Sequence, residues 1–178
     1  QAHNGNVSTQ LLKSNLSTES SNEGCPRISA VWKSKSPSVN VLLDGKPLTA
    51  IIDEGSEVSA IDTSIAERFN LSISRTIEAA HSAGSLSLPI SGKTVSDVIV
   101  NKSCNDTCIQ WNLGQCIVVN NLGCDLLIGE PAKVFNHIVT NPVSRTLVTK
   151  DKDFNKVSLS YDFNSNSETY SVKMNVYK

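Results

Sequence analysis

One acidic residue of the chain, Asp53, stands where a carboxylate could do chemistry. It directly follows the β-branched pair Ile51-Ile52 and precedes Glu54-Gly55-Ser56. A carboxylate at the end of such an apolar run would be buried unless the chain turns there, and the glycine can supply the turn. Two carboxylates brought close together can share one proton and activate a water molecule between them. Asp-x-Gly-Ser also fits an ordinary surface turn, so both interpretations stay open.

A second motif follows further along the chain, in Gly123-Cys124-Asp125-Leu126-Leu127-Ile128-Gly129. Together the two motifs resemble those of the retropepsins, the single-lobe aspartic proteases of retroviruses and long-terminal-repeat retrotransposons. That family pairs an apolar-apolar-Asp-Thr/Ser-Gly-Ala/Ser loop with a later apolar-apolar-Gly strand, which a short helix follows. The resemblance covers roughly residues 37 to 149 and is closest to the retrotransposon members.

The resemblance implies a mainly β fold, a single-lobe acid-protease-like closed barrel with two short helices. Strands around the two motifs would cross in a psi-shaped loop, with Leu127, Ile128 and Gly129 supporting the segment that carries Asp53. Asp53 would be the catalytic acid/base, contributed once per subunit. Because the chain has no second Asp-x-Gly-Ser or Asp-x-Gly-Thr segment, the active unit would be a homodimer. It would act on an extended peptide or polyprotein, with no cofactor and no metal.

Further residues receive roles from the same resemblance. Glu54, Gly55 and Ser56 would complete the active-site loop, with the Ser56 hydroxyl bonded to the outer oxygen of the catalytic carboxylate. A flap that closes over an extended peptide by backbone hydrogen bonds is expected at His81, Ser82, Ala83, Gly84 and Ser85. His81 also fits a solvated loop histidine, and Asp125 fits a residue that satisfies a turn.

Glu54 departs from the family pattern, which has a hydroxyl residue at this position. That hydroxyl donates and accepts hydrogen bonds across the dimer axis, whereas an ionised carboxylate only accepts. Two Glu54 carboxylates near a two-fold axis would also repel each other. Three arrangements remain open: a protonated Glu54 that donates, which favours dimerisation at acid pH; a Glu54 turned outward to a basic partner; or a weakened dimer with little or no activity.

Short strands and turns would position these residues. Asp44-Gly45 predicts a tight turn between strands at 39–43 and 47–52, so the hairpin leads directly into Asp53. The spacing Ser64-x-x-Glu67 predicts a capping box and a helix over 64–69. Pro131 suits the first turn of a second helix, which would reach about His137. Further strands are expected at 58–61, 109–112, 116–119, 126–128 and 143–149, and hairpins between 77 and 99.

Both ends of the chain differ from the retropepsin-like domain predicted at 37–149. Residues 1–36 are rich in Ser, Asn, Thr and Gln. They read as a flexible polar segment, since they cannot bury enough apolar surface to offset the entropy lost on ordering. Residues 150–178 predict a hairpin, because apolar and polar residues alternate over 157–163 and 170–176. This hairpin would complete the dimer sheet or begin the next region.

The composition excludes some partners. The 178 residues carry a net charge of −1, so no electrostatic footprint for nucleic acid or an anionic membrane is present. No apolar run approaches the ~20 residues that span a bilayer. Five cysteines without a secretory pattern favour reduced thiols and an intracellular location, in the cytoplasm or within a virus-like particle. Their spacing favours buried or loop thiols over a zinc site.

Three functions therefore compete. The first is a homodimeric aspartic endopeptidase of the retropepsin type that processes a polyprotein. The second is a catalytically impaired module of the same fold, which dimerises or holds peptides without cutting them. The third is an unrelated β-barrel interaction domain in which Asp53 caps a turn.

Overall fold

The computed structural model describes residues 16–17, 27–28, 36–75, 79–81, 87–163 and 173–175. The chain divides into two compact units, residues 1–34 and 35–178. In the first unit, strand β1 (Leu16–Ser17) pairs antiparallel with β2 (Arg27–Ile28). The second unit contains every residue to which the sequence assigns a functional role.

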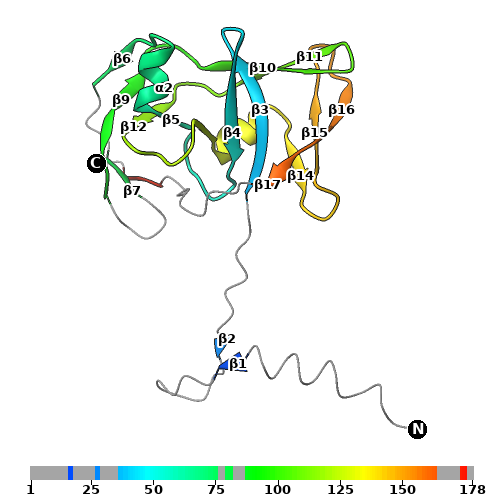
Figure 1. Ribbon diagram of the computed structural model, residues 1–178, viewed down its shortest axis with the longest axis horizontal. Coiled ribbons are helices and arrows are strands. Elements are labelled where there is room, and N and C mark those ends of the chain that lie inside the picture. Colours follow the sequence, from blue (N-terminus) through cyan, green and yellow to red (C-terminus); the bar gives the residue numbers. More distant parts are fainter. Residues whose placement is uncertain are drawn as a thin grey trace. The chain divides into compact units, whose positions relative to one another are not determined.

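One curled sheet dominates the second unit. Its strands are β3 (Pro37–Leu43), β4 (Lys46–Ile52), β5 (Ala60–Asp62), β6 (Ile73–Ser74), β9 (Ile90–Thr94), β10 (Ile99–Cys104), β11 (Thr107–Asn112), β12 (Ile117–Val119), β13 (Leu126–Ile128) and β17 (Asp162–Phe163). They follow the order β11-β10-β3-β4-β13-β5-β12-β9-β6, with β17 paired to β3. The sheet curls into a half-barrel (Figure 1). Together with two short helices, it confirms the predicted mainly β fold.

The predicted hairpin leads into Asp53. Leu43 pairs with Lys46, so Asp44 and Gly45 alone form the turn between β3 and β4. Both turn residues have a positive φ, 47° and 74°, as a type I′ turn requires, and the glycine adopts this conformation without strain. The last three residues of β4 are buried, so the chain leaves the interior as it reaches the acidic residue.

Strand β13 lies between β4 and β5. It pairs parallel with β4, with Ile128 opposite Ile52, and antiparallel with β5, with Leu127 opposite Ala60. All three residues of β13 are fully buried, which explains why the sequence here is a continuous apolar triplet and not an alternating one. The strand predicted at 126–128 is confirmed, and it joins two segments that flank Asp53.

Apolar side chains fill both faces of this central region. Leu126 and Ile128 belong to a large core cluster, whereas Leu127 belongs to a second, smaller one. Neighbouring residues of a strand point to opposite faces, so β13 contributes to both clusters. Trp111 lies in the large cluster, and its indole Nε1 donates a hydrogen bond to the Thr149 hydroxyl (3.0 Å). Strand β13 is thus packed against apolar side chains on both of its faces.

The two described helices are short. Helix α2 (Thr63–Arg68) begins after Asp62, whose carboxylate accepts a hydrogen bond from the Ser64 amide (2.9 Å). The prediction that Ser64 caps this helix is therefore wrong, because the helix begins at Thr63, before Ser64, and Asp62 is its N-cap. Helix α3 (Glu130–Phe135) has Pro131 in its first turn, as predicted, and ends at Phe135. In the described part of the chain, neither helix has the length and apolar character needed to span a bilayer.

The C-terminal part pairs differently from the predicted hairpin. Strands β14 (Val139–Asn141), β15 (Thr146–Lys150) and β16 (Lys156–Ser160) form a three-stranded sheet. Strand β18 (Lys173–Asn175) pairs with β7 (Ala79–His81), not with β16 or β17. The two arms predicted at 157–163 and 170–176 therefore join different strands, because alternation identifies a strand but not its neighbour.

Candidate functional site

The backbone around Asp53 is held on both sides. Its amide donates to the carbonyl of Ile128 at the end of β13 (2.9 Å), and its own carbonyl accepts from the Ser56 amide (3.1 Å). The Gly55 amide donates to Oδ1 of the Asp53 carboxylate (2.8 Å). The residue is half-buried. The carboxylate is thus oriented by its own loop while it remains open to solvent on one side.

Gly129 lets the Asp53 loop approach β13 closely. A Cβ atom at this position would lie 2.4 Å from the Val58 carbonyl oxygen and 3.0 Å from that of Ser56. The contact is closed by hydrogen bonds: the Glu130 amide donates to the Ser56 carbonyl (2.8 Å), and the Gly129 amide donates to the Ser59 hydroxyl (3.1 Å). The structure therefore brings the two sequence motifs together, and it requires a glycine where they meet.

Ser56 is fully buried beneath the loop. Its hydroxyl donates a hydrogen bond to the Val58 carbonyl (2.9 Å). This bond ties the start of the turn to its end, so Ser56 stabilises the loop from inside. The proposed bond between the Ser56 hydroxyl and the outer oxygen of Asp53 stays a prediction.

Glu54 contacts elements of its own chain. Its carboxylate forms an ion pair with the Lys133 ammonium on α3 and accepts a hydrogen bond from the Thr140 hydroxyl on β14 (3.3 Å). The hydrogen bond from Lys133 lowers the pKa of Glu54 from its ordinary value of 4.5; partial burial opposes the shift, and the charge of Lys133 adds to it. Glu54 is therefore ionised at neutral pH, in the second of the three arrangements expected, turned to a basic partner.

The Glu54 carboxylate affects the pKa of a buried tyrosine, Tyr161. Burial raises the pKa of Tyr161, and the charge of Glu54 raises it further, whereas the Arg145 guanidinium opposes the shift. Among the described residues, the Tyr161 hydroxyl has no hydrogen-bond partner. Its ring packs edge-on against Phe163, with centroids 5.9 Å apart. No motif indicated this neighbour, because Tyr161 is only one apolar position of a predicted strand.

Two other carboxylates near the loop have structural roles. Asp125 accepts a hydrogen bond from the Thr49 amide (3.1 Å), a backbone group of strand β4 and not of a turn. Asp62 caps α2 and also accepts from the Leu122 amide (2.9 Å). Burial alone would raise the pKa of Asp62, but its hydrogen bonds from Ser64 and Leu122 outweigh this effect and lower it. These carboxylates serve the fold and do not duplicate Asp53.

The described cysteines are free thiols: Cys104, Cys108, Cys116 and Cys124. Burial, and then the charges of Asp125, Asp62 and Asp53, raise the pKa of Cys124 to about 12. This thiol stays protonated at neutral pH, so it cannot act as a nucleophile. Within the described ranges, no group of three or more His, Cys, Asp or Glu residues could hold a metal ion.

The predicted flap falls partly outside the described residues. His81 ends β7, which pairs antiparallel with β8 (Ser87–Leu88), so that His81 lies opposite Ser87. The other flap residues, Ser82, Ala83, Gly84 and Ser85, lie between these two strands and outside the described residues. The backbone of the two strands is thus arranged as a hairpin, and the role of the flap stays a prediction.

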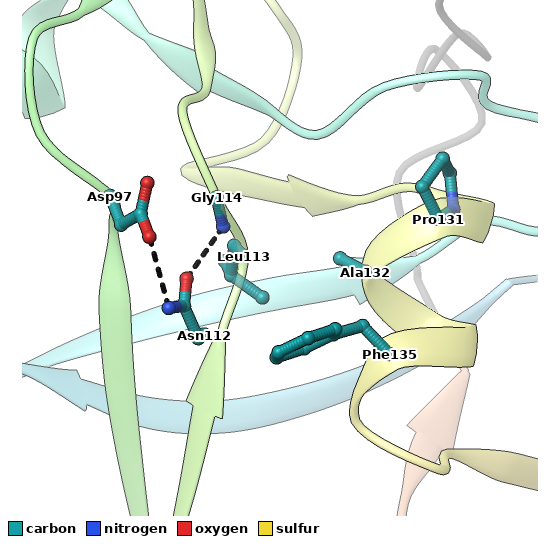
Figure 2. Close-up of a pocket in the computed structure, with 7 residues that line it drawn as sticks. All are labelled: Asp97, Asn112, Leu113, Gly114, Pro131, Ala132 and Phe135. Atoms are coloured by element: carbon teal, nitrogen blue, oxygen red, sulfur yellow. Dashed lines mark hydrogen bonds between the residues drawn. The ribbon is translucent and has the colours of Figure 1, made fainter.

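A pocket of about 290 Å³ opens beside α3 (Figure 2), and none of the predicted site residues lines it. It is lined by Asp97, Asn112, Leu113, Gly114, Pro131, Ala132 and Phe135. Figure 2 shows Leu113 and Phe135 facing each other across it. Its polar groups are bonded among themselves: Asn112 Nδ2 donates to Asp97 Oδ2 (3.0 Å), and the Gly114 amide donates to Asn112 Oδ1 (2.8 Å). No sequence motif indicated this pocket.

Comparisons with known proteins agree with the fold. The structure resembles the crystal structure of the retroviral protease-like domain of Ddi1 from Leishmania major, with a TM-score of 0.51 and 16% sequence identity. The match covers 76% of this chain and 99% of that one. No protein-family model and no curated protein sequence matches the chain. At this identity the likeness concerns the fold alone, which is retropepsin-like.

Proposed function

Because the chain has a retropepsin-like fold with one Asp-x-Gly-Ser segment, we propose that it is one subunit of a homodimeric aspartic endopeptidase. Its substrate is an extended peptide, such as a polyprotein segment of a retrotransposon-type element. The observation that carries this proposal is the setting of Asp53. The residue is half-buried and its carboxylate is oriented by the Gly55 amide, while its backbone amide is bonded to Ile128 of the buried strand between β4 and β5.

The proposed reaction needs two copies of Asp53. One carboxylate is ionised and takes a proton from the water as the water oxygen attacks the peptide carbonyl carbon. The other is protonated and gives its proton to the carbonyl oxygen. Transfer of a proton to the amide nitrogen then accompanies cleavage of the C–N bond. Two carboxylates close enough to bind one water cannot both ionise, so the pair holds the single proton that the reaction uses.

A second candidate keeps the fold and the dimer but not the chemistry. It is favoured by one observation: Glu54 is ionised and bound to Lys133, so it cannot donate the hydrogen bond that a hydroxyl would donate across the axis. In this case the dimer would hold extended peptides without cutting them.

Cleavage of a mixed peptide library separates the two candidates. We expect the dimeric protein to cut peptides somewhere between about pH 4 and pH 7, in a manner that pepstatin blocks. The Asp53→Asn variant should lose cleavage and keep its fold, because the amide is isosteric but cannot exchange the proton. Asp44→Asn, the same change at an exposed turn, is the matched control and should cleave normally. A proven dimer that cuts nothing across this range would leave the peptide-holding candidate.

A further inference from the structure

The two side chains of the Glu54–Lys133 ion pair differ in their exposure to solvent. The Lys133 side chain is only 12% exposed, whereas the Glu54 side chain is 61% exposed. An ammonium group withdrawn from water to this degree needs a partner, because an unpaired charge loses its hydration without compensation. Glu54 supplies that partner, and in return its position is fixed by a residue that has little freedom to move.

Helix α3 and strand β14 both bind the Glu54 carboxylate. Lys133 lies on α3 and Thr140 on β14, and both contact the same carboxylate oxygen, Oε1. Both elements follow β13 in the chain, so the loop that follows β4 is bonded to the region after β13. The loop is also attached to β13 itself through the Asp53 amide and the Ile128 carbonyl. The active-site loop is therefore braced from two sides within one chain.

Neither Arg145 nor Tyr161 bonds to the Glu54 carboxylate, whose partners are Lys133 and Thr140. The Arg145 guanidinium lies over the Phe163 ring, 4.7 Å from its centroid. The Tyr161 hydroxyl is buried and neutral over the pH range of interest, because its pKa is raised. Lys133 is thus the cation that contacts the carboxylate and compensates its charge.

We propose that Lys133 is a positioning residue, which holds the Glu54 carboxylate against α3 and β14 and so braces the active-site loop within the subunit. The inference rests on the proposed function, because Asp53 is the residue that this loop carries. In a dimer, Asp53 and its neighbour lie near the two-fold axis. There, two uncompensated Glu54 carboxylates would repel each other, and Lys133 removes that repulsion from each subunit separately.

Removal of the ammonium tests this role. At pH 7 and low salt, we expect Lys133→Met to raise the dimer dissociation constant on the order of tenfold, as measured by sedimentation equilibrium. The double variant Glu54→Gln/Lys133→Met should recover most of this loss, since the neutral amide no longer repels its mate. Lys156→Met, at an exposed lysine of β16, is the matched control and should leave the constant unchanged. A double variant that dimerises no better than Lys133→Met would overturn the proposal.

Amide hydrogen exchange, measured on dilute protein that is monomeric in every variant, gives a readout that depends neither on dimerisation nor on cleavage. Residues 53–57 should exchange faster in Lys133→Met than in wild type, and Lys156→Met should match wild type. If the loop exchanges equally in all three proteins, Lys133 does not brace it, and the proposal fails. A wild-type protein that stays monomeric and cuts nothing would instead refute the proposed function, while the exchange result would still decide the role of Lys133.

Discussion

Glu54 is the residue at which this chain departs most from the retropepsin pattern, and the structure changes what its replacement should do. From the sequence, Glu54→Thr restores the hydroxyl of the family. In the structure, the same change leaves the Lys133 ammonium, which is 12% exposed, without its carboxylate. The new hydroxyl would favour dimerisation, whereas the loss of the Lys133 partner would destabilise the subunit. The single substitution therefore does not isolate either effect.

We accordingly predict that Glu54→Thr lowers the free energy of unfolding by about 1 kcal/mol at pH 7, a value kept small because the carboxylate is mostly exposed. Adding Lys133→Met should recover the loss. The Glu54 pKa is lowered in the folded state, so its contribution is present above its ordinary value of 4.5 and is lost as the pH falls through the lower folded pKa. Urea denaturation from pH 7 to pH 3 measures this; a difference that does not shrink at acid pH would contradict the assignment.

At the residue scale, the sequence could identify Asp53 but not its surroundings. The motif and the turn are local, and they predicted correctly where the chain leaves β4. The partner of Glu54 is 79 residues away in the chain, and Lys133 carries no motif that distinguishes it from other surface lysines. Similarly, Ser64 has the spacing of a cap, but the helix begins one residue before it, because Asp62 at the end of β5 accepts the Ser64 amide and so acts as the N-cap.

At the scale of elements, the central feature is the position of β13 between β4 and β5 in the sheet. Gly129 ends this strand at a point where backbone, and not a movable side chain, blocks a Cβ atom: the Val58 carbonyl oxygen would be 2.4 Å away. Relief would require moving β13 or the Asp53 loop, both of which are tied down by hydrogen bonds. The fold thus depends on a glycine here for lack of space.

Gly129→Ala should therefore destabilise the protein by about 3 kcal/mol, at the upper end of the usual cost of overpacking. Gly45→Ala is the matched control: its φ is +74° but nothing lies within 4 Å of the added Cβ, so it should cost only about 1 kcal/mol of backbone strain. Urea denaturation of both variants gives the comparison. Equal losses would show that β13 and the loop can separate without penalty.

The elements themselves were partly predictable. Asp44-Gly45 fixed one hairpin, because a type I′ turn has a strong local signature. The turn between β10 and β11, at Asn105 and Asp106, also has a positive φ at both residues. An Asn-Asp pair favours such a turn, which was not predicted from the sequence. The partners of β16, β17 and β18 were missed, since the choice between strands of similar pattern depends on contacts far apart in the chain.

At the scale of the whole molecule, the proposed reaction needs two carboxylates of the Asp53 kind, and one subunit offers one. Asp53 lies where β4 enters the loop, and its carboxylate accepts from an amide of that loop, whereas Asp62 and Asp125 bind backbone amides at Leu122 and Thr49. The likeness to the protease-like domain of Ddi1, at 16% identity, supports the fold but not the chemistry. The proposed reaction therefore needs a second copy of the chain, and the sequence alone could not show which surfaces of the two copies would be in contact.

The geometry of the dimer tests this requirement most directly. In a crystal structure of the homodimer, we expect the two Asp53 carboxylates to face each other across the two-fold axis, with one water within about 2.6–3.2 Å of both. Each Glu54 should remain on the Lys133 of its own subunit. A dimer in which the two Asp53 carboxylates are splayed too far apart to share a water would contradict the assignment of Asp53 as half of a catalytic pair.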